Sequence, residues 1–156
     1  MKFVSEQIIE TVADELDTTE SAYEAAVMDL EERQPVILAY LFTEDFEAFS
    51  QQERDFILYL LIVLWKAIER VNGEVIPATE DNLMDAEEKN WSLLQDVKAT
   101  RFHERLDVFF QDYPQEDLLA FVEDALSDEE DEWVTKEGRE AVFITLKSII
   151  DCWTQA

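Results

Sequence analysis

The sequence predicts an all-α protein built as a compact bundle of about eight helices. Apolar residues recur at helical spacing along nearly the whole chain, while the strict alternation of strands and the dipeptides of tight hairpins are missing. Only 2 Gly and 3 Pro interrupt 156 residues, of which 47% are hydrophobic. A chain of this length buries about two-thirds of its unfolded surface, so one domain covering residues 1–156 is expected.

The first three helices are predicted from apolar stripes and start signals. Residues 5–16 carry one apolar face, and the sequence Asp17-Thr18-Thr19-Glu20 has capping-box spacing with Asp17 as the cap of a second helix. Pro35 suits the first turn of a third helix, where its missing N–H is not needed. That helix covers residues 36–42, and an extension through Phe46 and Phe49 is left open.

The fourth helix has the strongest start signal in the chain. Ser50 and Glu53 form a capping box directly before an apolar run, and Asn72-Gly73 supplies a typical helix end. The run from Phe56 to Trp65 is apolar on every side, which predicts a central helix surrounded by the others.

The second half of the chain predicts further helices and suggests an internal duplication. The stripe of Tyr23, Ala26 and Leu30 falls on Phe102, Arg105 and Phe109, and Pro35 precedes an apolar helix much as Pro114 does. The pseudo-repeats would be residues 1–73 and 79–156, packed about an approximate two-fold axis. The alternative is that two helix-rich halves match by chance.

The charge of the chain excludes some classes of partner. Asp and Glu number 38 against 12 Lys and Arg, which gives a formal net charge of −26. A nucleic acid or an anionic membrane requires clustered basic residues on the protein, so neither is an expected partner.

The compartment follows from three absences in the sequence. Glu6 interrupts the N-terminus before an apolar signal segment can form, and the longest apolar run has ten residues, about half of a membrane span. Cys152 is the only cysteine, and it is expected to be a small core residue. A cytoplasmic protein without a membrane segment is therefore expected.

Residues for catalysis are few, and we assign no catalytic residue, metal ligand or cofactor. His103 is the only histidine, and Asp107 lies one turn beyond it. Lys98, Arg101 and Arg105 share a face if one helix runs through them. These five residues are a weak candidate for an anion or metal patch; the alternative is a solvated surface whose cations compensate nearby carboxylates and helix carbonyls.

An acidic segment ending in a tryptophan is the candidate partner surface. It comprises Glu129, Glu130, Asp131, Glu132 and Trp133. A tryptophan among acidic residues offers contact area and a cation–π surface to a basic partner. The alternatives are a solvated linker for the acidic residues and, for Trp133, packing against its own helix.

The function most compatible with these features is non-enzymatic binding of a basic protein partner. An adaptor, an inhibitor or immunity-like protein and a nucleic-acid mimic all fit that description. One alternative is an enzyme or metal-binding protein with a carboxylate-lined pocket between the two halves. Another is that the acidity serves solubility or high salt. Neither the partner nor the oligomeric state follows from the sequence.

Overall fold

The all-α prediction is confirmed in the part of the chain that the structure describes. The computed structural model describes residues 1–41, 49–127 and 138–155, and these residues form eight helices and no strand. The helices are α1 (Glu6–Thr18), α2 (Glu20–Arg33), α3 (Pro35–Leu41), α5 (Gln51–Asn72), α6 (Glu80–Gln95), α7 (Phe102–Phe110), α8 (Glu116–Ser127) and α9 (Arg139–Thr154).

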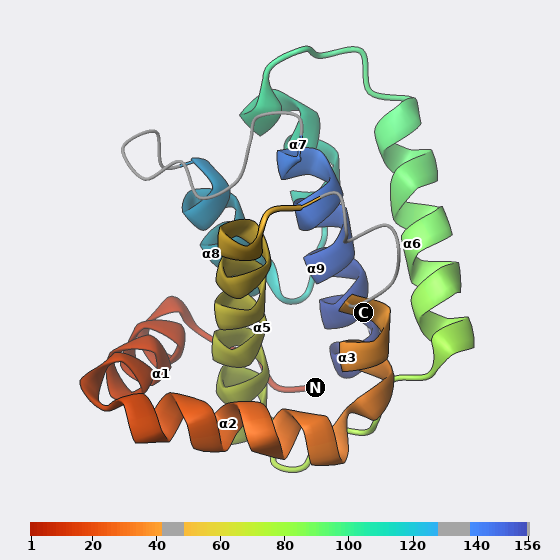
Figure 1. Cartoon of the computed structure of the whole chain (residues 1–156). Coiled ribbons are helices and arrows are strands. Elements are labelled where there is room, and N and C mark those ends of the chain that lie inside the picture. The colour runs from red at the N-terminus through yellow and green to blue at the C-terminus, as the bar shows by residue number, and fades with distance from the viewer. Residues whose placement is uncertain (42–48, 128–137, 156) are drawn as a thin grey trace.

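Helices α5 and α9 contact each other, and other helices pack on both of them (Figure 1). Helices α1 and α2 lie against α5, whereas α6 and α8 lie against α9. Helix α8 also contacts α1, and α7 contacts both α6 and α8. The α5–α9 and α1–α8 contacts therefore join the first half of the chain to the second.

Most of the predicted helix starts agree with the structure, and one is corrected. Ser50 Oγ accepts a hydrogen bond from Glu53 N at 3.1 Å, and Glu53 Oε1 accepts one from Ser50 N at 3.0 Å, as a capping box requires. The cap of the second helix is not Asp17 but Thr19, whose Oγ1 accepts from Ala22 N at 3.2 Å. The reason is that α1 continues to Thr18, so only Thr19 is left extended between the two helices.

Two predicted helix boundaries lie at proline and glycine. Pro35 is the first residue of α3, as its fixed φ favours. Helix α5 ends at Asn72, and Gly73 follows it with a φ of 79°, in the region that favours glycine. The suggested extension of the third helix through Phe46 falls on residues 42–48, outside the described residues.

The core lies around α5 and α9. Leu60 to Trp65 are each at most 1% exposed, while Phe56, Leu58 and Tyr59, earlier in the same run, are half-buried. In α9 all nine residues from Val142 to Ile150 are buried, including Lys147. The prediction singled out α5 alone, but α9 is buried on all sides over a longer stretch.

A buried glutamine ties the bend between α2 and α3 to the C-terminal helix. Gln34 is 1% exposed, and its Oε1 accepts hydrogen bonds from Trp153 Nε1 at 3.1 Å and from Ala78 N at 3.0 Å. Its Nε2 donates to the carbonyl of Val75 at 3.3 Å. One side chain thereby satisfies buried backbone groups of the segment between α5 and α6.

The predicted duplication stays a prediction. The described helices divide into α1, α2, α3 and α5 in residues 1–73 and α6, α7, α8 and α9 in residues 79–156. Packing of α1 on α5 corresponds to packing of α6 on α9, and α1 on α2 corresponds to α6 on α7. The close packing of α8 on α9 has no counterpart of similar extent between α3 and α5.

Candidate functional site

A groove between α1 and α8 combines acidic walls with an apolar floor. It has a volume of about 350 Å³, and we call it the acidic groove. Among the described residues, its lining consists of Glu6, Ile9, Glu10, Asp117, Ala120, Phe121 and Asp124. Four of the seven residues are acidic and none is basic, so the groove offers carboxylates around an aromatic ring to an incoming cation.

Hydrogen bonds between residues 2–6 and residues 115–117 hold the start of α1 against the start of α8. Glu6 N donates to Asp117 Oδ2 at 2.9 Å, and Val4 N donates to Gln115 Oε1 at 3.0 Å. Gln115 Nε2 in turn donates to the carbonyl of Lys2 at 3.0 Å. Because two helix N-termini meet here, their partial positive charge favours the acidic residues of both first turns.

The acidic groove continues into an acidic stripe along α1. Glu6, Glu10, Asp14 and Asp17 are spaced by four, four and three residues, so they share one face of α1, and all four are exposed. Neither α1 nor α8 contains a Lys or Arg. The stripe is therefore not neutralised by any side chain of its own helix or of α8.

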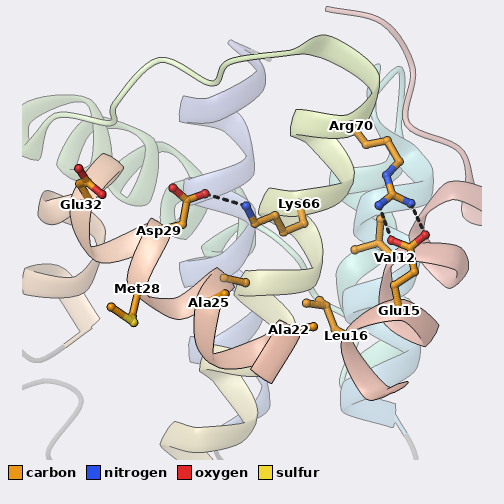
Figure 2. Close-up of a pocket in the computed structure, with 11 residues that line it drawn as sticks. Val12, Glu15, Leu16, Ala22, Ala25, Met28, Asp29, Glu32, Lys66 and Arg70 are labelled. Carbon is orange, nitrogen blue, oxygen red and sulfur yellow. Dashed lines mark hydrogen bonds and ion pairs between the residues drawn. The ribbon is translucent and has the colours of Figure 1, made fainter. Parts of the chain in front are cut away.

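A second groove, between α1, α2 and α5, has a different electrostatic character (Figure 2). Its volume is about 640 Å³, its lining includes Ala22, Ala25 and Ala26, and we call it the alanine groove. Lys66 Nζ donates to Asp29 Oδ2 at 2.7 Å, and Arg70 Nη1 donates to Glu15 Oε1 at 3.0 Å. Since both of its cations already pair with carboxylates of facing helices, this groove attracts a charged partner less than the acidic groove does.

The five residues of the weak candidate patch, Lys98, Arg101, His103, Arg105 and Asp107, are not carried by one helix, and their role stays a prediction. Helix α7 begins at Phe102, so no helix runs through Lys98 and Arg101, and the shared face expected for the three cations does not exist. Arg105 donates to the Ala99 carbonyl at 2.9 Å and pairs with Glu140. The loop before α7 folds back onto Arg105, which is why the cation contacts loop carbonyls rather than its sequence neighbours.

The single histidine lies at the surface. The His103 side chain is 61% exposed, and its Nδ1 lies 2.6 Å from Glu123 Oε1. Asp107 is exposed. Over residues 1–41, 49–127 and 138–155, no group of three His, Cys, Asp or Glu side chains could hold a metal ion.

The acidic segment with Trp133 lies outside the described residues. Glu129, Glu130, Asp131, Glu132 and Trp133 all belong to residues 128–137. Their role as a partner surface stays a prediction.

A buried polar cluster between α6 and α9 was not predicted from the sequence. Lys147 Nζ donates to Asp151 Oδ2 and to Asn90 Oδ1, both at 2.9 Å, and it lies 4.7 Å from the centre of the Tyr113 ring. Tyr113 OH also donates to Asp151, and Asn90 Nδ2 donates to Ser148 Oγ at 3.0 Å. Burial lowers the pKa of Lys147, and burial together with Asp151 raises the pKa of Tyr113.

This cluster has the character of a structural element. Every polar group named in it has a hydrogen-bond partner, and neither Lys147 nor Asp151 lines the acidic groove or the alanine groove. The signal that could have revealed it is a lysine four residues before an aspartate inside an apolar helix.

Cys152 is half-buried beside the core, and burial followed by the charge of Asp151 raises the pKa of its thiol from 9.0 to about 11. At about pH 8 the thiolate fraction is therefore about 100-fold lower than in an ordinary thiol, and we expect alkylation by iodoacetamide to be slower by at least about that factor. Mass spectrometry of timed samples measures the rate. The urea-unfolded chain is the control, and equal rates in both states would contradict the expectation.

The same shift contributes to stability in one direction. A thiol pKa raised on folding favours the folded state fully below about pH 9, and this contribution is lost as the pH rises through about 11.

No helix among the described residues has both the length and the hydrophobicity to cross a membrane. Comparison with protein-family models, with characterised proteins and with solved structures finds no match to the chain.

Proposed function

We propose that this chain is a non-enzymatic binding protein that takes a basic helical segment of a partner protein into the acidic groove. The observation that carries the proposal is the lining of that groove, to which the described part of the chain contributes four carboxylates, three apolar residues and no cation. Grooves between two helices commonly receive an amphipathic helix, whose apolar side chains fill the floor while its polar side chains meet the rim.

The apolar floor makes the groove more than a charged surface. Ile9 is buried at the base of the groove, whereas Ala120 and Phe121 are half-buried, so a partner side chain can contact the exposed apolar atoms of these two residues between the acidic walls. A Lys or Arg side chain fits such a site, because its aliphatic stem packs on apolar surface while its charged end reaches the carboxylates.

The net charge supports the same kind of partner. Opposite charges steer two proteins together and raise the association rate, and the effect weakens with added salt. With a formal net charge of −26, this chain favours basic partners over its whole surface, so the test must separate the groove from the general charge.

Two variants of equal net charge make that separation. Glu10→Gln with Asp124→Asn removes one carboxylate from each wall of the acidic groove, whereas Glu24→Gln with Glu31→Gln removes two exposed carboxylates of α2. The probe is a fluorescein-labelled amphipathic peptide that carries Arg and Leu on one helical face, and its anisotropy is measured at about 0.15 M salt.

The groove variant is expected to lose about 3- to 30-fold in affinity for the peptide, since two ion pairs of exposed carboxylates contribute up to about 1 kcal/mol each. The α2 variant is expected to change the affinity by about twofold or less. Equal losses in the two variants would mean that the peptide binds through the net negative charge of the protein and not through the acidic groove, and this would contradict the proposal.

A further inference from the structure

A shallow pocket lined by two aromatic rings lies where the end of α1 meets the start of α5. Its volume is about 690 Å³. Its lining consists of Asp17, Gln51, Gln52, Asp55, Phe56 and Tyr59, and we call it the tyrosine pocket. As in the acidic groove, none of the described residues that line it is basic.

The Tyr59 ring is held in place on two sides. Its hydroxyl donates to Asp17 Oδ2 at 3.3 Å, and its centre lies 6.1 Å from the centre of the Tyr23 ring. A ring fixed in this way offers its face to a cation without further ordering, and a Lys or Arg over such a face gains a cation–π interaction.

Two carboxylates, those of Asp17 and Asp14, act electrostatically on the Tyr59 ring. Burial, followed by the charge and hydrogen bond of Asp17, the charge of Asp14 and the neighbouring Tyr23, raises the pKa of Tyr59 to about 12. Burial and the charge of Asp55 raise the pKa of Tyr23 as well. Burial, the largest cause of both shifts, disfavours any charge, but the carboxylates that add to them, Asp17, Asp14 and Asp55, favour a positive charge beside these rings.

The acidic stripe of α1 connects the tyrosine pocket to the acidic groove. Glu6 and Glu10 line the groove, Asp17 lines the pocket, and Asp14 lies between them on the same face. Asp17 lies eleven positions after Glu6, which corresponds to a length of about 16 Å along the helix.

We infer that the tyrosine pocket is a second subsite for the same basic segment and takes a Lys or Arg side chain about eleven helical residues from the cation in the acidic groove. The inference rests on the proposed function. Residues eleven apart on a helix share a face, so one straight helix of about three turns reaches both subsites.

Two labelled peptides of the same composition test the spacing. In the first, two Arg residues lie eleven positions apart; in the second, they lie nine apart, which turns one of them to the opposite face. The first peptide is expected to bind the wild-type protein about three- to tenfold more tightly than the second, as one added cation–π contact with nearby carboxylates provides. Equal affinities would overturn the second subsite.

Variants at the tyrosine pocket test its chemistry. Gln52→Lys places a cation in the pocket at an exposed position, and Gln111→Lys makes the same change at an exposed residue beyond α7. Gln52→Lys is expected to weaken binding of the first peptide about three- to tenfold and binding of the second by less than about twofold. Gln111→Lys is expected to change the affinity for neither peptide by more than about twofold.

Tyr59→Leu removes the aromatic ring and is expected to weaken binding of the two peptides as Gln52→Lys does. Tyr59→Phe keeps the ring and is expected to keep the affinity.

The failure of this inference is distinguishable from failure of the proposed function. If the pocket variants affect both peptides equally while Glu10→Gln with Asp124→Asn still weakens the binding of both, the second subsite is contradicted and the proposed binding in the acidic groove is not. If the groove variant loses no more affinity than the α2 variant, the proposed function itself is contradicted, whatever the pocket variants show. Circular dichroism of each variant shows whether the helices are retained.

Discussion

Replacing Leu61 with aspartate is expected to abolish folding. Leu61 is fully buried within α5, in the stretch from Leu60 to Trp65 where every side chain is at most 1% exposed. An unpaired carboxylate at this position costs several kcal/mol, in addition to the apolar burial that is lost. Domains of this kind are stable by about 5–15 kcal/mol, so the loss removes most of the free energy of unfolding.

Thermal unfolding followed by circular dichroism measures this effect. The matched control is Leu93→Asp, because Leu93 is 39% exposed on α6 and its carboxylate reaches water. The control is expected to lose no more than about 1 kcal/mol. A soluble Leu61→Asp variant that melts cooperatively would show that this part of α5 is not enclosed by the other helices.

Removing the carboxylate of Asp151 is expected to destabilise the protein by about 3–5 kcal/mol, because it leaves Lys147 as a buried cation without its charge partner. The Lys147 side chain is 7% exposed, and the two Asp151 oxygens lie 2.9 and 3.2 Å from its Nζ. Asp151 also accepts hydrogen bonds from Tyr113 and Asn90, so Asp151→Ala breaks three contacts at once. Urea denaturation measures the change.

The double variant tests the cause of that loss. Lys147→Met combined with Asp151→Ala removes both charges, and we expect it to be more stable than Asp151→Ala alone by about 1–3 kcal/mol. If the second substitution lowers stability further instead, the loss comes from the hydrogen bonds to Tyr113 and Asn90, and the buried charge is not its source.

Helix starts and ends were predictable because their signals are local. The Ser50 and Glu53 capping box, Pro35 at the start of α3 and Asn72-Gly73 at the end of α5 all depend on residues within one turn. The cap assigned to Asp17 was wrong for a local reason as well. Two helices separated by one residue leave a choice of cap, and the spacing of side chains does not decide where the first helix ends.

Neither acidic site followed from the composition, although each uses residues that are plain in the sequence. With 38 acidic residues, spacing does not show which carboxylates lie together. Asp117 meets Glu6 across a separation of 111 residues, and Asp17 meets Tyr59 across 42. The shared face of Lys98, Arg101 and Arg105 failed for a similar reason, because the prediction assumed a helix where the chain forms a loop.

By itself the sequence determined the all-α class of the fold and most of the helix boundaries. It also determined the large negative net charge and the lack of an apolar run long enough to cross a membrane. Helical periodicity shows which face of each helix is apolar, since that information lies within three or four neighbouring residues. Only the tertiary structure decided that α9 is enclosed as fully as α5, that Lys147 and Asp151 are buried together, and that α1 packs on α8 to form the acidic groove. Those features depend on which apolar face meets which, and that choice is made by packing between residues far apart in the chain.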